Sequence, residues 1–89
     1  MTIGIIGPEL SGRQIQEHLK AISPETKTIL YPLETTAGAL EIIDQCEAEC
    51  TAVLFTGVAV CTSVIQRHTM VRAYEYVTKD AYSLLTTLR

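Results

Sequence analysis

Thr2–Gly7 (TIGIIG) and Thr51–Gly57 (TAVLFTG) are two short apolar runs that each end at a glycine. Neither run alternates apolar with polar residues, and this pattern is typical of strands buried on both faces in a parallel sheet covered by helices. Ligands of open α/β sheets bind just beyond the carboxyl ends of such strands. We therefore expect any functional site to lie at Gly7–Gly12 and Gly57–Thr62.

The length and composition of the chain are those of one small folded domain. Its 89 residues, 47% hydrophobic and 19% charged, suffice for a core and differ from the composition of disordered chains. An α/β domain usually has about 100 to 150 residues, and Ala81–Arg89 (AYSLLTTLR) resembles the first turns of a helix. We therefore expect residues 1–89 to be the N-terminal part of a longer protein.

Charge and hydropathy exclude several classes of partner. No apolar run approaches the roughly 18 residues that cross a membrane, and the N-terminus has no signal-peptide pattern. We therefore expect a cytoplasmic protein without membrane contact. The net charge is −3 and the lysines and arginines form no cluster, so no direct contact with nucleic acid is expected.

Strand and helix patterns alternate along the chain. They predict strands at Thr2–Gly7, Thr26–Tyr31, Ala52–Thr56 and Arg72–Thr78. They predict helices at about Arg13–Ala21, over about 13 residues after a Thr36 N-cap, at Val58–Arg67 and after an Asp80 N-cap. Short connections in this order favour right-handed crossovers. We predict an α/β fold of three layers (α/β/α) with a four-stranded parallel sheet in the flavodoxin-like order 2-1-3-4.

The helix patterns also predict which side chains are buried. Ser11 and Gln14 resemble a capping box that starts the first helix. The second helix has an inward stripe of Ala39, Leu40, Ile43 and Cys46, with Glu41, Asp44 and Glu47 outward. The inward residues of the third helix are Val60, Val64 and Ile65.

The fourth strand differs because its residues alternate. Ala73, Glu75 and Val77 alternate with Tyr74, Tyr76 and Thr78, as in an edge strand or a strand whose second face is only partly covered. Its tyrosines and open ladder would suit a homodimer contact or a contact with a downstream domain. Tyrosines packed under the strand's own helix are the alternative.

The three cysteines are an odd number in a chain without an export signal, so a disulfide framework is not expected. Cys46 and Cys50 lie one helical turn apart, and we expect them to be reduced residues of the core. Two thiols do not complete a zinc site, which needs four ligands, or three and a water. No metal site is predicted.

The first candidate site is Gly7–Gly12 (GPELSG), where the amides at a helix N-terminus would favour an anion. The dinucleotide fingerprint requires glycine at the position of Glu9, whose carboxylate would repel a pyrophosphate. A tight turn with a capped helix is the alternative interpretation.

The second candidate site is Gly57–Thr62, at the next strand-to-helix turn of the same crevice. The hydroxyl of Thr62 and the first amides of the helix would suit a small carboxylate or phosphate. Cys61 would be stabilised as a thiolate by the same helix N-terminus, but no histidine and acid are spaced to complete a catalytic arrangement.

The segments AVLFTG, ending at Gly57, and YEYVTKDAYSLLTTL, beginning at Tyr74, together with the N-terminal IGIIGP run, resemble the N-terminal sensor domain of propionate-catabolism-type transcriptional activators. The resemblance implies one of two α/β halves that enclose a small metabolite, with DNA-binding modules further along the chain. The sequence departs from that family after the third strand, where only Gly57 stands in place of several small residues.

We therefore expect a regulatory domain of a transcriptional regulator that acts by effector sensing or dimerisation, without a cofactor and without enzymatic activity. The candidate residues for binding a small anionic metabolite are Gly7, Pro8, Glu9, Ser11, Gly57, Thr62, Thr78, Lys79 and Asp80. The alternative is a Rossmann-like nucleotide- or cofactor-binding domain of an enzyme, with Cys61 or Glu9 as the reactive group. A purely structural interaction module is a third interpretation.

Overall fold

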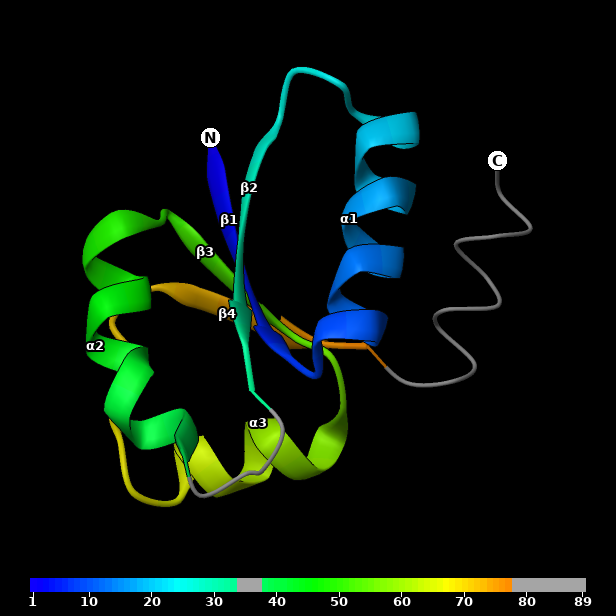
Figure 1. Cartoon of the computed structure of the whole chain (residues 1–89). Helices are drawn as coiled ribbons and strands as arrows, with labels where there is room; N and C mark the ends of the chain where they lie inside the picture. Colours follow the sequence, from blue (N-terminus) through cyan, green and yellow to red (C-terminus); the bar gives the residue numbers. More distant parts are fainter. Residues whose placement is uncertain (34–37, 78–89) are drawn as a thin grey trace.

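The computed structural model describes residues 1–33 and 38–77. Strands and helices alternate along the chain (Figure 1). The elements are β1 (Thr2–Gly7), α1 (Glu9–Ile22), β2 (Lys27–Pro32), α2 (Ala39–Glu49), β3 (Ala52–Phe55), α3 (Val58–Ile65) and β4 (Ala73–Tyr76). The predicted helix after Asp80 lies outside the described residues. No helix among those described is long and apolar enough to cross a membrane.

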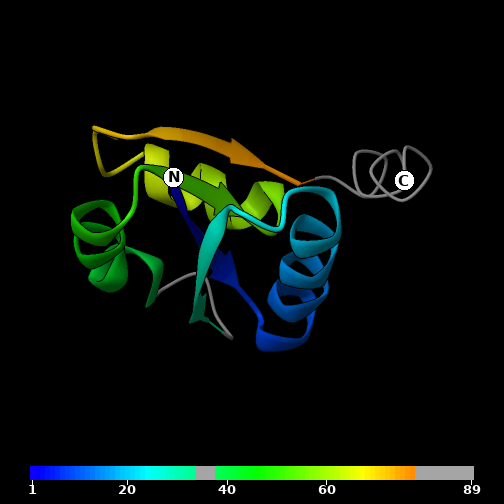
Figure 2. The same cartoon turned by 90° about the horizontal axis from the view of Figure 1, so that it is seen from above.

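The four strands form one parallel sheet in the order β2-β1-β3-β4, which confirms the predicted topology. β1, one of the two interior strands, pairs with both neighbours, so that Ile5 lies opposite Leu30 on β2 and Leu54 on β3. β2 and β4 are the edges of this sheet, and Figure 2 shows β4 along its outer side. The chain reverses its direction of strand addition between β1 and β3, which makes that boundary the topological switch point.

Helices cover both faces of the sheet, as a three-layer α/β/α fold requires. α1 and α2 lie on opposite sides of the strands in Figure 1. Consecutive residues of β1 therefore enter different cores: Ile6 packs with α2 and α3, whereas Ile5 packs with Ile15 of α1, and both isoleucines are 0% exposed. The uninterrupted apolar pattern of Thr2–Gly7 follows from this burial on both faces.

The start of α1 differs from the prediction. The helix begins at Glu9 instead of about Arg13, and the carbonyl of Pro8 accepts the amide of Gly12 at 2.8 Å. Ser11 therefore lies inside the first turn and does not cap the helix; Pro8 occupies the N-cap position without a side-chain cap. Proline starts a helix readily because it lacks the amide that would have no partner there, and Glu9 suits the positive end of the helix dipole.

The end of β2 and the buried face of α3 also differ from the prediction. β2 extends to Pro32, one residue beyond the predicted end at Tyr31; an edge strand tolerates proline because one side of its ladder is unpaired. In α3 the buried stripe is Val60, Cys61 and Val64, and Ile65 is 42% exposed. The prediction that Ile65 faces inward was wrong, since its position lies about 100° further around the helix than Val64.

Cys46 of α2 and Cys50, which follows the helix as its C-cap, are core residues, as predicted. Cys46 and Cys50 are free and buried. Their thiols lie against Gly4 of β1, where an added Cβ would contact Cys46 Sγ and would lie 2.9 Å from Cys50 Sγ. Gly4 thus lets the C-terminal end of α2 approach the centre of the sheet.

Candidate functional site

The two predicted sites, Gly7–Gly12 and Gly57–Thr62, lie side by side at the carboxyl ends of β1 and β3, on either side of the switch point. Gly7 ends β1, and Gly57 follows β3 in the N-cap position of α3. The amide of Thr56 donates to the carbonyl of Ile6 at 3.0 Å, so that the two strand ends are held side by side. This is the place where open α/β sheets bind ligands.

The Thr56 side chain occupies the space beside Gly7. A Cβ added to Gly7 would lie 2.6 Å from Thr56 Cβ, closer than real side chains approach one another. Gly7 is therefore required for the close contact of the two strand ends. In the dinucleotide fingerprint the glycines of this turn instead admit the backbone of the turn to a pyrophosphate.

The first turn of α1 already holds a paired carboxylate. Glu9 Oε1 lies 2.8 Å from Nη2 and 3.2 Å from Nε of Arg13, one helical turn along, and both side chains are exposed. The negative charge of Glu9 already interacts favourably with the positive end of the helix dipole. Gly12, further into the helix, lies so close to β2 that an added Cβ would contact Leu30 Cδ1. Gly12 thus has the helix-packing role of the last fingerprint glycine, while Glu9 opposes an anion.

The N-terminus of α3 is more open than the N-terminus of α1. A Cβ at Gly57 would meet no atom within 4 Å, and no acidic residue lies in the first turn. Thr62 is exposed in the second turn of this helix. Burial, together with the nearby charge of Glu75, raises the pKa of Cys61. Cys61 is therefore a protonated core thiol, and the geometry does not favour its role as a nucleophile.

The structure brings only part of the predicted site together. Gly7, Pro8 and Gly57 lie together at the carboxyl ends of β1 and β3. Glu9 and Ser11 belong to the first turn of α1, and Thr62 lies on α3. Thr78, Lys79 and Asp80 lie outside the described residues.

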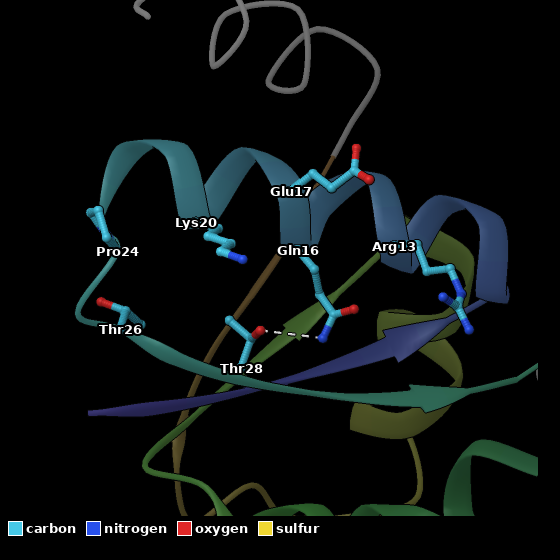
Figure 3. A pocket seen from close by; sticks show the side chains of 7 residues that line it. All are labelled: Arg13, Gln16, Glu17, Lys20, Pro24, Thr26 and Thr28. Carbon is cyan, nitrogen blue, oxygen red and sulfur yellow. Dashed lines mark hydrogen bonds between the residues drawn. The ribbon is translucent and has the colours of Figure 1, made fainter.

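Grooves open elsewhere on the described part of the chain, and those between α1 and β2, along β3 and β4, and beside His68 are not lined by Gly7 or Gly57. A polar groove of about 390 Å³ runs between α1 and β2 (Figure 3). A second, apolar groove of about 390 Å³ lies along β3 and β4. A third, of about 330 Å³, lies between the end of α3 and β4, beside His68 and Met70.

The polar groove carries charges of both signs. Its lining residues are Arg13, Gln16, Glu17, Lys20, Pro24, Thr26 and Thr28. Gln16 Nε2 donates to Thr28 Oγ1 at 3.2 Å across the groove, as Figure 3 shows. Arg13 is already paired with Glu9. The groove therefore offers no concentrated charge of one sign to a small ion.

A buried carboxylate that the sequence analysis placed on the surface anchors the segment before β4. Glu47 was predicted to face outward from α2, but it is only 5% exposed. Its Oε1 lies 2.6 Å from His68 Nε2, and its Oε2 accepts the backbone amides of Val71 and Arg72 at 2.8 and 2.9 Å. Arg72 Nε in turn donates to the Glu47 carbonyl at 3.0 Å.

The sequence did contain a signal for this burial. Ala39, Ile43, Cys46 and Glu47 follow the i, i+4, i+7, i+8 spacing of one helix face. The prediction was wrong because an acidic residue was assigned to solvent by its type, whereas a buried carboxylate is stable when its oxygens are hydrogen-bonded. Its partners lie 21 to 25 residues along the chain, beyond the range of any local pattern.

The surroundings of Glu47 keep it ionised. Burial raises its pKa, but the hydrogen bonds from His68 and from the amides of Arg72 and Val71 lower the pKa more, so that it lies below the ordinary value of 4.5. Asp44, Glu47 and His68 place three potential metal-ligand atoms within 4.8 Å of one another. Both oxygens of Glu47 already have hydrogen-bond partners in His68, Val71 and Arg72. We therefore interpret the cluster as a structural link between α2 and the segment before β4, and not as a metal site.

The edge strand β4 is the most exposed element of the sheet. All four of its residues are exposed, with Tyr74 at 41% and Tyr76 at 42%. The ring of Phe55 lies in edge contact with that of Tyr74, with centroids 6.3 Å apart. Val71, just before the strand, is 77% exposed. The predicted edge strand is thus confirmed, and its open ladder is flanked by exposed tyrosines together with the exposed charged residues Arg72 and Glu75.

Comparison of the chain with models of protein families, with curated proteins and with solved structures finds no match.

Proposed function

We propose that the chain is a regulatory domain that acts by dimerisation, in which two copies pair through their β4 strands. The observation that carries the proposal is the exposure of β4, whose four residues all face solvent at the edge of the sheet. An open edge with aromatic side chains is a template for another strand, and natural monomers usually protect such edges.

The backbone of β4 supports this mode of pairing. The amide of Val77 donates to the carbonyl of Phe55 at 2.8 Å, and thus points toward β3. Backbone groups alternate in direction along a strand, so that the amides of Tyr74 and Tyr76 face the open side. These donors, and the carbonyls of the same two residues, are available to a second copy.

Dimerisation suits the geometry better than effector sensing at the switch point. Thr56 occupies the space at Gly7, and the Glu9 carboxylate stands at the N-terminus of α1, where an anionic effector would bind. The proposal includes a regulatory role in a transcriptional regulator, because the sequence resembles propionate-type sensor domains. The DNA-binding function would then belong to other modules of the protein.

The proposal is tested by the mass of the chain in solution, measured by light scattering over a range of concentrations. We expect a species of twice 9.8 kDa at high concentration. The variant Tyr76→Pro removes an amide that faces the open edge and leaves the ladder to β3 intact, so it should be monomeric. Tyr76→Phe keeps both the ring and the amide and is the matched control.

A monomeric wild-type chain at every concentration would contradict the proposal. A dimer that survives in Tyr76→Pro would place the subunit contact elsewhere on the molecule. A monomer whose melting temperature rises only with a dinucleotide would favour the alternative, cofactor-binding function, because a ligand that binds only the folded state stabilises it.

A further inference from the structure

One face of the sheet is only half covered by the described residues. α1 packs on β1 and β2, and on the same face an apolar groove of about 390 Å³ lies open along β3 and β4. Its lining includes Ile3, Leu19, Leu54 and Val77, and these four side chains belong to one apolar cluster with Ile5 and Ile15. Glu75 is the one charged side chain in this lining. A surface of this kind on a small domain indicates that something apolar covers it.

We propose that this groove is the docking site for residues 81–89 of the same chain. The path of the chain at the end of the sheet supports this occupant. Val77 continues the ladder through its amide, is only 8% exposed, and belongs to one apolar cluster with Ile5 and Ile15. The chain therefore leaves the sheet at the groove, with its last described side chain packed on the face that α1 half covers.

The sequence of this segment matches the groove in pattern and in length. Ala81, Leu84, Leu85 and Leu88 follow the i, i+3, i+4, i+7 spacing of one apolar helix face. A nine-residue helix is about 13 Å long, and the five residues from Ala73 to Val77 extend over about 16 Å. Residues 78–80 provide a connection of the length that is usual between a strand and a helix.

The polarity of the segment also fits a helix with one buried face. Ser83 and Thr86 lie opposite the leucine stripe on a helical wheel and would face solvent. The leucines would contact Leu54 and Val77, and would complete the second helix of this layer. This inference concerns the face of β4 and does not depend on pairing along its edge.

The direct test is an NMR measurement of contacts between methyl groups in the full chain. We expect nuclear Overhauser effects from Leu84, Leu85 or Leu88 to Leu54 and Val77. A sample that mixes differently labelled chains separates contacts within one chain from contacts between two. Contacts only between chains would overturn the proposal in favour of a second copy as the occupant, and leucine methyls without contact to the groove would overturn it altogether.

Paired substitutions give an independent readout. Leu85→Asp places a charge on the face that would be buried, whereas Thr86→Asp places the same charge on the opposite face. We expect the first variant to lower Tm by about 4–8 °C or more, and the second to change Tm little. Equal effects of the two variants would contradict the proposal. Neither substitution touches the β4 edge, so the dimer should persist in both.

Discussion

Glu47 and His68 link α2 to the segment that leads into β4, with Oε1 of the carboxylate 2.6 Å from Nε2 of the imidazole. The other carboxylate oxygen accepts the amides of Val71 and Arg72. One side chain thus fixes the path of the chain between α3 and the edge strand. The position of the exposed edge strand β4 therefore depends on the buried carboxylate of Glu47.

Replacement of Glu47 should therefore loosen β4. Glu47→Ala leaves two backbone amides without their acceptor, and we expect a loss of about 2–4 kcal/mol in the free energy of unfolding, measured with urea. Asp44→Ala is the control, because the Asp44 side chain is 86% exposed and lies 3.8 Å from His68; its effect should stay within about 0.5 kcal/mol. Similar losses in both variants would contradict the anchoring role of Glu47.

The same carboxylate should make the stability of the fold depend on pH. The folded-state pKa of Glu47 lies below its ordinary value of 4.5, so its ionised form stabilises the folded state. That contribution is complete above about pH 4.5 and is lost as the pH falls through the folded-state pKa. The urea midpoint should therefore fall less steeply below pH 4.5 in Glu47→Gln than in the wild type. Identical pH profiles would contradict the assignment.

The two glycines of the predicted site should respond differently to alanine. Gly7→Ala would force its Cβ against Thr56, and we expect a loss of about 1–3 kcal/mol. Gly57→Ala adds a methyl group in open space at an extended backbone conformation, with φ of −166°, and should be nearly neutral. Thermal unfolding measures both. A larger loss at Gly57 than at Gly7 would contradict the described contact of the strand ends.

The cysteines should be unreactive in the folded protein. Burial raises the pKa of Cys46 to about 12, with a further contribution from Cys50, and burial also raises the pKa of Cys61. Since the thiolate is the reactive form and all three cysteines are buried, a thiol reagent at pH 8 should label them only slowly until urea unfolds the chain. Rapid labelling of Cys61 in the folded state would revive its role as a nucleophile.

The sheet could be predicted from the sequence because its pattern is strong and local. Thr2–Gly7 has no polar alternation, and this alone predicted burial on both faces, as Ile5 and Ile6 confirm. The alternation in the fourth strand likewise predicted the exposed edge. The alternation of strands and helices favoured right-handed crossovers and one parallel sheet, and the flavodoxin-like order predicted for that sheet is the one observed.

The details of the candidate site could not be predicted in the same way. The start of α1 at Glu9 depends on Pro8, which suits both a turn and a helix start. The burial of Glu47 depends on partners contributed by a distant segment. Likewise, the Gly7–Thr56 contact arises only when two strands far apart in the sequence lie side by side.

The pairing of β4 strands is tested most directly by hydrogen exchange of individual amides, followed by NMR at low and at high protein concentration. The amide of Val77 is bonded to Phe55 within one copy and should be protected at both concentrations. The amides of Tyr74 and Tyr76 face the open edge, and they should exchange rapidly at low concentration and become protected as the concentration rises. Rapid exchange of both tyrosine amides at every concentration would contradict the proposed dimer.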